Sequence, residues 1–239
     1  MERNIICMKW GTKYGPDYVE RLHRAVCKHL TGPFRFICFT DDAVGLPDGV
    51  ENFPIPPLSL DPNAPERGWK KLTVLSDPLE DITGQVLFLD LDIVITGDLS
   101  VFFEYPGDFC IIQDWLLKSQ GIGNSSVFRF NAGAHADVLR YFRENQERVK
   151  AEVRNEQAFL TRQVRENFDV TFWPPEWCVS FKRSCIPPFP FLYFRSPTLP
   201  KGARVVVFHG HPNPPEAIQG KGRGFRRFKP APWIKEHWA

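Results

Sequence analysis

Three features of the 239-residue sequence predict an α/β fold, with a mixed, mostly parallel sheet flanked by helices. The chain opens with a strand–helix–strand pattern. Its later apolar runs have the length of buried strands, and segments of helical period separate some of these runs but not all. The length suits one α/β domain. Because the later strands are not each separated by a helix, we expect the sheet to be parallel at its start and mixed afterwards.

The first half of the chain supplies the parallel strands. A buried strand is expected at residues 4–11, a helix at 16–30 and a second strand at 34–42. Residues 46–68 are rich in proline and polar residues and read as an irregular excursion. A helix broken near Pro78 is expected to follow.

The second half opens with "QVLFLD", a continuous apolar run typical of a central parallel strand. The remaining strands are expected at residues 109–115, 125–133, 170–181 and 203–210, and the remaining helices at 136–149 and 156–164.

The composition, with 43% hydrophobic and 24% charged residues, is that of an ordinary soluble globular protein. The sequence has no apolar run of about 18 residues, as a transmembrane helix requires, and no signal-peptide pattern. Its six cysteines are scattered without a CxxC pair. We therefore expect a cytoplasmic protein.

Charge is distributed unevenly. Residues 217–239 carry six Lys/Arg against one acid, a net charge of +5, although the whole chain is only +2. The expected organisation is a domain at residues 1–216 and a basic, tryptophan-containing tail at 217–239. This tail suits anionic phosphates or a membrane surface, or is simply a solvated terminus. Trp233 and Trp238 would dock on a membrane or fold back as a lid.

Two carboxylates, Asp90 and Asp92, stand one residue apart in the middle of the most apolar stretch of the chain. Burying two like charges is costly unless something compensates them. Because side chains alternate along a strand, both point to the same side. A divalent cation that prefers oxygen ligands, Mn²⁺ or Mg²⁺, would neutralise them and gather phosphate oxygens. The alternative is a strand end with two solvated aspartates.

The segment "VLFLDLDIVITGDL" resembles the DxD region of GT-A glycosyltransferases, in particular the retaining family-8 enzymes and their bacterial relatives. The resemblance implies a single GT-A domain, in which Asp90 and Asp92 bind the metal. Asp90 and the intervening Leu91 also contact the nucleotide-sugar donor.

A second segment, "VVVFHGHPNPPEA", resembles the C-terminal metal motif of the same family. It implies that His209 is the third metal ligand and that Gly210 binds the donor. Asn213 stands where the family has a phosphate-binding lysine and lacks its charge. His211 or the basic tail would then supply a positive charge to the phosphates.

Weaker matches lie earlier in the chain. "CMKWGTKYG" resembles the family's first strand, which implies donor contacts from Lys9, Trp10 and Gly11 and stacking of Tyr14 on a nucleobase. A surface tyrosine is the alternative for Tyr14. "GWKKL" resembles the segment before the DxD strand, where Lys71 would face the donor phosphates.

The middle of the chain supplies the remaining candidates. "RNEQAFL" resembles the family's segment near the reacting sugar carbon, which implies catalytic roles for Glu156 and Gln157. A glutamate at a helix start also interacts favourably with the helix dipole, so both interpretations of Glu156 stay open. In "GIGNSSVFRF", Asn124 and Ser125 are candidates for binding sugar hydroxyls.

Together these segments predict a Mn²⁺- or Mg²⁺-dependent enzyme that transfers a sugar from a nucleotide-sugar donor, first of all a UDP-sugar, to an acceptor hydroxyl with retention. The acceptor would be a carbohydrate or a lipid-linked sugar, as in cell-surface polysaccharide synthesis, with peripheral membrane contact through the tail. Nucleic acid is not an expected partner, because the only basic cluster is terminal and lacks an aromatic sheet motif.

Two alternatives remain open. In a haloacid-dehalogenase-like phosphatase, Asp90 would be the nucleophile and Asp92 the acid/base. That motif usually opens its domain, whereas here it follows nearly 90 residues, and no later acidic pair completes it. A non-catalytic sugar-nucleotide binder on the same scaffold is the second alternative, although such a binder would not need three metal ligands.

Overall fold

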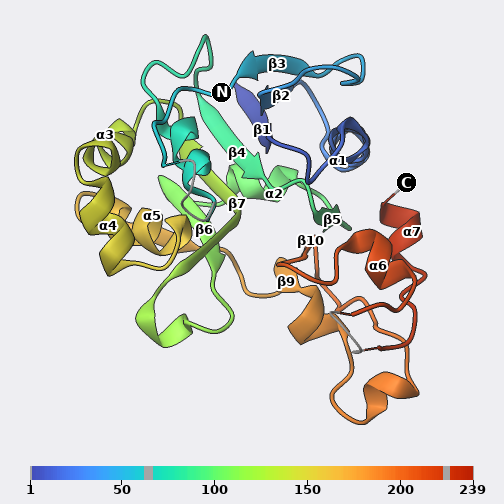
Figure 1. Cartoon of the computed structure of the whole chain (residues 1–239). Helices are drawn as coiled ribbons and strands as arrows, with labels where there is room; N and C mark the ends of the chain where they lie inside the picture. Colours follow the sequence, from blue (N-terminus) through green and yellow to red (C-terminus); the bar gives the residue numbers. More distant parts are fainter. Residues whose placement is uncertain (1, 62–66, 223–226, 239) are drawn as a thin grey trace.

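The computed structural model describes residues 2–61, 67–222 and 227–238. A seven-stranded sheet of order β3-β2-β1-β4-β7-β6-β8 forms its centre (Figure 1). Its strands are β1 Arg3–Lys9, β2 Arg35–Thr40, β3 Glu51–Pro54, β4 Gln85–Leu89, β6 Phe109–Gln113, β7 Gly123–Asn131 and β8 Val170–Phe172.

The sheet is parallel in its first half and mixed in its second, as expected. β1 pairs in parallel with β2 and β4, and β2 pairs in parallel with β3. β7 is antiparallel to both β4 and β6, because a short connection rather than a crossover helix joins β6 to β7. β8 then returns parallel to β6.

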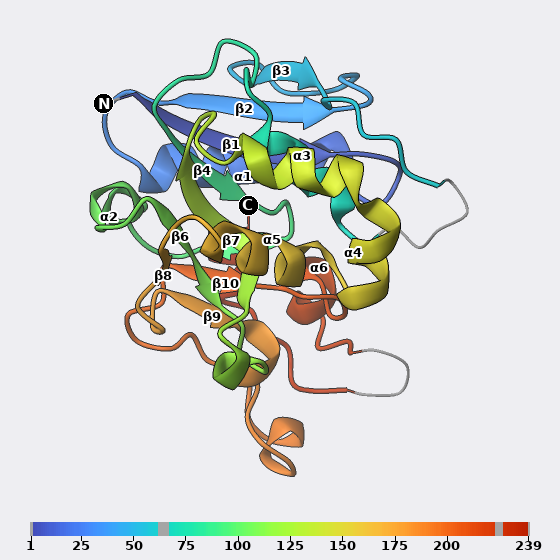
Figure 2. The same ribbon diagram turned by 90° about the vertical axis from the view of Figure 1, so that its left-hand side faces the viewer.

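Helices cover both faces of this sheet. α1 (Pro16–His29) and α2 (Ser100–Glu104) lie on one face. The other face carries the 3-10 helix η1 (Trp69–Leu75) and three helices, which Figure 2 shows side by side. These three are α3 Ala136–Glu144, α4 Gln146–Glu152 and α5 Glu156–Arg165. The result is a three-layer α/β/α arrangement with a separate apolar core on each side of the sheet.

A second sheet of three short strands, in the order β5-β10-β9, lies beyond the carboxyl end of β4. β10 is antiparallel to β5 and parallel to β9. Its strands are β5 Ile93–Ile95, β9 Cys178–Ser180 and β10 Val205–Val207, and the short helices around it are η3 Phe181–Cys185 (a π-helix), η4 Phe191–Tyr193, α6 Pro214–Ile218 and α7 Ile234–His237. A further 3-10 turn, η2 (Lys118–Gln120), lies in the connection between β6 and β7.

The C-terminal segment packs against this small sheet. Ala231 and Ile234 are fully buried and Trp238 is 6% exposed, all within the apolar core that the β5-β10-β9 sheet supports. The ring of Trp238 is therefore not available to a membrane. Trp233 is partly buried, and its Nε1 donates a hydrogen bond to the carbonyl of Pro197. The division at residue 216 stays a prediction, and residues 223–226 and 239 of the tail lie outside the described residues.

Four elements differ from expectation. The strand expected at residues 170–181 is two strands, β8 and β9, which belong to different sheets. The stretch read as irregular contains β3, an exposed edge strand in which the terminal Pro54 is tolerated. The segment at residues 68–82 forms the 3-10 helix η1 rather than an α-helix. The helix expected at residues 136–149 is two helices that meet at Asn145. Over the described ranges, no helix is both long and apolar enough to cross a bilayer.

Candidate active site

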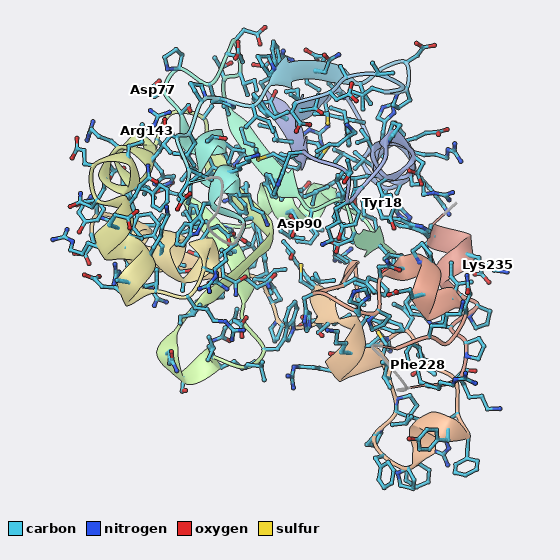
Figure 3. All side chains as sticks on the ribbon, in the orientation of Figure 1. Tyr18, Asp77, Asp90, Arg143, Phe228 and Lys235 are labelled. Carbon is cyan, nitrogen blue, oxygen red and sulfur yellow. The ribbon has the colours of Figure 1, made fainter. Side chains whose placement is uncertain are left out.

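A cavity of about 360 Å³ opens where β4 ends, between the large sheet and the small one. In Figure 3, Asp90 lies near the centre of the molecule, directly after β4. The cavity brings together residues from segments far apart in the sequence. Twelve of the predicted site residues line it: Trp10, Tyr14, Lys71, Asp90, Leu91, Asp92, Asn124, Ser125, Glu156, Gln157, His209 and Gly210.

Lys71 forms the centre of a buried polar network in this cavity. Its Nζ lies 2.8 Å from Asp90 Oδ1 and 3.9 Å from Glu156 Oε1. The same nitrogen donates to the carbonyl and the hydroxyl of Ser125, both at 3.3 Å. Burial would lower the pKa of Lys71, but the attraction of Asp90 and Glu156 outweighs it and raises this pKa above its ordinary value. The lysine is therefore a fixed positive charge at the end of β4.

Glu156 extends into the cavity from the first turn of α5. Its side chain accepts a hydrogen bond from the Ser125 hydroxyl, and the residue is 5% exposed. Burial raises the pKa of Glu156, although Lys71 and Ser125 oppose that shift. The cap of α5 is instead Asn155, whose side chain accepts from the Ala158 N–H at 3.3 Å. Glu156 thus sits at the helix start, as in the structural interpretation, while its carboxylate joins the Lys71 network.

Gln157 is held on two sides. Asn124 Nδ2 donates to Gln157 Oε1 at 3.2 Å, and Gln157 Nε2 donates to Asp114 Oδ2 at 3.3 Å. Asp114 follows β6 directly and also accepts from the backbone of Leu116 and Leu117. The amide orientation at the cavity wall is therefore set by partners on β7 and after β6. Asp114 was not among the predicted site residues, although it too is an acid at a strand end.

Asp92 is the most buried carboxylate of the predicted metal set, at 8% exposure. Tyr14 donates its hydroxyl to Asp92 Oδ2 at 2.6 Å. Burial and the neighbouring charge of Asp90 raise the pKa of Asp92 to about 6, with Tyr14 opposing the shift. The centroid of the Tyr14 ring lies 4.7 Å from that of the Tyr18 ring. The Lys13 ammonium lies 4.5 Å from the centroid of the Tyr14 ring. Neighbours thus occupy part of the ring surface that a nucleobase would need.

His209 faces the cavity from the end of β10 but is held by its own neighbours. Its Nε2 lies 2.6 Å from the Ser180 hydroxyl, and its ring stacks on Trp115 at a centroid distance of 5.4 Å. Lys182 donates to the His209 carbonyl. Burial, with the positive charges of Lys182 and Arg183, lowers the pKa of His209 to about 4, so the imidazole is neutral at pH 7. A neutral imidazole is the form that binds a metal.

The three predicted metal ligands line one cavity without forming a closed ligand set. Within residues 2–61, 67–222 and 227–238, no group of three or more His, Cys, Asp or Glu side chains is close enough to hold an ion. Asp90 is instead paired with Lys71, and His209 Nε2 lies at hydrogen-bond distance from the Ser180 hydroxyl. The two aspartates still suit a divalent ion. Burial, and then the charge of Asp90, raise the pKa of Asp92, and a cation beside this carboxylate would oppose both effects.

Lys9 and Gly11 lie outside the cavity lining. Lys9 is 4% exposed, and its Nζ donates to the carbonyl of Asp42 at 2.8 Å. The N–H of Gly11 donates to Asp41 Oδ2 at 2.9 Å. Both contacts tie the loop after β1 to the end of β2, so the two residues fix the loop that carries Trp10.

Asn213 also lies outside the lining, where it caps α6. Its Oδ1 accepts from the Glu216 N–H at 3.0 Å, and Glu216 accepts in return from the Asn213 N–H at 2.8 Å. This reciprocal pair is a capping box. Glu216 also lies 3.0 Å from His211 Nδ1, so that imidazole has a carboxylate partner of its own.

Five residues line the cavity without having been predicted: Met8, Lys13, Gly68, Ser126 and Phe208. Gly68 has a sequence signal, since it opens the "GWKKL" segment. It adopts φ +81°, and a Cβ there would lie 2.9 Å from Glu156 Oε2. Lys13 and Ser126 directly neighbour predicted residues. Met8 and Phe208 are apolar residues within the quoted segments "CMKWGTKYG" and "VVVFHGHPNPPEA" and directly precede the predicted residues Lys9 and His209.

Similar proteins were found among solved structures. The galactosyltransferase LgtC, solved with donor and acceptor sugar analogs, superposes with a TM-score of 0.59 at 12% identity, over 88% of this chain and 88% of that one. The glycosyltransferase GlyE of Streptococcus pneumoniae gives 0.63 at 12% identity, over 99% of this chain and 60% of that one. The bifunctional glycosyltransferase WbbM superposes with a TM-score of 0.58 at 13% identity, over 89% of this chain and 46% of that one.

No family model and no curated protein matches the sequence. At such low identity the superpositions establish the fold, not the chemistry. The expected architecture is confirmed: the chain has the GT-A-like α/β fold of these glycosyltransferases, with its cavity at the carboxyl end of β4.

Proposed function

We propose that the protein is a glycosyltransferase that uses this cavity to transfer a sugar from a nucleotide-sugar donor, first of all a UDP-sugar, to an acceptor hydroxyl. The observation that carries the proposal is the convergence at the end of β4 of Asp90, Asp92, Lys71 and the pair Glu156–Gln157. In an open α/β sheet, ligands bind at the carboxyl ends of the strands.

The donor diphosphate is the group that this charge pattern suits best. Lys71 offers a buried ammonium, and charge-assisted hydrogen bonds to phosphate oxygens are strong. The carboxylates of Asp90 and Asp92 would repel a diphosphate unless a cation lay between. Mn²⁺ or Mg²⁺ fits them, since both ions prefer oxygen ligands, and His209 would join if its ring left Ser180. When bound, such an ion stabilises negative charge on a departing diphosphate.

Polar groups beside this charged cluster suit the sugar. Asn124, Ser125 and Gln157 offer amide and hydroxyl groups in a site of fixed orientation. Glu156 and Gln157 are our candidates for stabilising positive charge on the sugar carbon. One LgtC structure is of an active-site mutant in which glutamine is replaced by glutamate, so a glutamine serves the active site of that protein. By analogy, we assign Gln157 the role nearest the reacting centre.

Retention of configuration and a carbohydrate or lipid-linked acceptor, as in cell-surface polysaccharide synthesis, are part of the same proposal. They rest on the family resemblance of the sequence. Membrane contact by the tail would depend on its lysines and arginines, because Trp238 is buried.

The experiment is a panel of nucleotide sugars with and without Mn²⁺, read out as thermal shift and as release of the free nucleotide. We expect one donor to raise the melting temperature only with Mn²⁺, and to be slowly hydrolysed. Asp92→Asn should abolish both effects. Asp108→Asn, an exposed acid outside the cavity, serves as the matched control.

The alternatives give different results in the same panel. Turnover of a generic phosphate ester, with no response to any nucleotide sugar, would indicate a phosphatase and overturn the proposal. The position of Asp90 after the fourth strand rather than the first argues against that outcome. Donor binding without hydrolysis, and without transfer to any of a set of acceptor sugars, would indicate a non-catalytic binder.

A further inference from the structure

An aromatic loop, residues 186–197, projects from the body of the protein between β9 and β10. Figure 1 shows this orange segment extending below both sheets. Ring-bearing side chains stand out from its tip in Figure 3. Four of its side chains are exposed large apolar groups: Phe189 at 76%, Phe191 at 47%, Tyr193 at 50% and Phe194 at 76%. Four such rings within six residues are unusual on a water-facing surface.

Backbone hydrogen bonds and the packing of Leu192 fix the position of the loop. The N–H of Thr198 donates to the Cys185 carbonyl at 3.1 Å and closes its base. The N–H of Lys229 donates to the Leu192 carbonyl at 3.1 Å, and Leu192 packs against the small-sheet core. Within the tip, the N–H of Arg195 donates to the Phe191 carbonyl at 2.8 Å. The aromatic tip is therefore anchored from two sides, and its exposure is a property of the fold.

Positive charge is concentrated in the part of the sequence that contains the aromatic loop. From Cys178 to the C-terminus the sequence carries 11 Lys/Arg and two acids, a net charge of +9, which leaves −7 for the first 177 residues. Between Cys178 and Pro215 there is no acid at all. Arg195 lies within the loop, with its guanidinium 4.9 Å from the Phe191 ring centroid. Arg183, Lys201 and Lys229, on the segments that hold the loop, are also exposed.

We propose that the aromatic loop docks this protein on an anionic membrane surface, with its rings in the interfacial layer and the surrounding cations against lipid phosphates. Aromatic residues favour the membrane interface, and lysines and arginines near it are attracted to anionic lipids. A projecting convex tip needs a matching concave pocket on a protein partner, whereas lipid deforms around it. Lys182 on η3 and Ser180 on β9, the elements that precede the loop, both contact His209.

The docking does not depend on the proposed sugar transfer, and its test contains no sugar donor. The purified protein is sedimented with phosphatidylcholine vesicles, with or without phosphatidylglycerol, at low and at high salt. We expect binding to the anionic vesicles, and weakening by salt because surface charges are screened. The double variant Phe189→Ser/Phe194→Ser should reduce partitioning into the vesicles roughly tenfold or more, since it removes two of the rings that enter the interfacial layer of the membrane.

Two controls match the variants. Val44→Ser changes an 80%-exposed apolar side chain in the loop after β2 and should bind as the wild type does. Arg195→Glu should weaken binding more than Arg140→Glu, which makes the same charge change on α3, another exposed site. All five substitutions in these four variants alter exposed side chains, so the melting temperatures of the variants should match that of the wild type.

Four results would overturn the proposal. The first is a wild type that stays in the supernatant with anionic vesicles. The second is equal binding of the wild type to neutral vesicles, and the third is wild-type binding by the double variant. The fourth is a concentration-dependent dimer in sedimentation velocity that the double variant abolishes, since the aromatic loop would then contact a second copy of this chain.

Discussion

Lys71 and Asp90 form a partly buried ion pair at the end of β4, with 2.8 Å between Nζ and Oδ1; the Lys71 side chain is 11% exposed and that of Asp90 24%. The two residues come from different elements, η1 and the turn after β4, and Glu156 on α5 joins them at 3.9 Å. One cation thus holds three segments of the cavity in place. This pairing makes the site part of the fold, so that changes to it should alter stability as well as activity.

Lys71→Met tests this coupling. It leaves Asp90 and Glu156 without their cation, and breaking a buried pair in this way typically costs about 3 kcal/mol. We expect a loss of that order in the free energy of unfolding, measured with urea at pH 7. Lys70→Met, the neighbouring lysine with no ion pair among the described residues, should change it by less than about 0.5 kcal/mol. If Lys71→Met lost as little unfolding free energy as Lys70→Met, the Lys71–Asp90 pair would be unimportant for stability.

Asp92 predicts how stability depends on pH in the absence of metal. Its pKa in the folded chain is raised to about 6. A carboxyl with a raised folded pKa stabilises the fold fully below its unfolded pKa, near 4, and that contribution is lost as pH rises through 6. We therefore expect Asp92→Asn to gain stability over the wild type between pH 4 and pH 7, by as much as about 3 kcal/mol.

The measurement is urea unfolding in EDTA at several pH values. The Asp108→Asn variant, at an exposed acid, provides the reference curve and should run parallel to the wild type. If Asp92→Asn also ran parallel over this range, then Asp92 would not carry an uncompensated charge, and the case for a cation beside it would weaken.

Gly68→Ala tests the glycine that sequence reasoning missed. Gly68 has φ +81°, and an added Cβ would lie 2.9 Å from Glu156 Oε2 and 3.2 Å from its Cδ. Gly202 has φ +86°, with its nearest contact 3.5 Å away. Both alanine variants should lose about 1 kcal/mol from the backbone conformation. Only Gly68→Ala should also displace Glu156 and lower donor turnover; equal turnover in the two variants would remove Glu156 from the chemistry.

The sequence predicts those parts of the fold and of the site that depend on neighbouring residues. The strand before Asp90, the helix after Pro16 and the strand–turn positions of Asp90 and Asp92 follow from hydrophobic period and proline placement. The pairing of Lys71 with Glu156 does not, because the two are 85 positions apart and only the folded sheet brings them together.

The missed elements have the same cause. The β3 strand is an exposed edge without an apolar pattern, so nothing in residues 51–54 indicates it. Trp238 looks like a membrane anchor beside basic residues, yet it packs on Tyr18 at a ring distance of 5.3 Å. Whether a tryptophan ring is buried depends on segments far away in the sequence, so the composition of the tail does not predict it.

Asn213→Ser separates a capping role from a phosphate-binding role. Serine caps helices about as well as asparagine, so the α6 capping box should survive with little loss of stability. Asn213→Ala should instead cost about 1 kcal/mol. If Asn213 acts only as a cap, donor KM should be unchanged in Asn213→Ser. A KM that rises several-fold in this variant, with its melting temperature intact, would support a contact between the Asn213 amide and the donor phosphates.

Ser180→Ala tests whether His209 can become a metal ligand. The Ser180 hydroxyl lies 2.6 Å from His209 Nε2, the atom that a metal would use in this orientation of the ring. An ion that recruits His209 must therefore break this hydrogen bond, whose net value is about 1 kcal/mol. Removing the hydroxyl removes the competitor, so Mn²⁺ affinity should rise about five-fold in Ser180→Ala.

The affinity is read from the electron paramagnetic resonance signal of free Mn²⁺. Ser184→Ala, at an exposed serine on the π-helix η3 that follows Ser180, should leave the titration unchanged. His209→Ala should weaken binding and cancel the gain when combined with Ser180→Ala. A gain that persisted in that double variant would mean that Mn²⁺ binds without the imidazole, and the metal site would then consist of Asp90 and Asp92 alone.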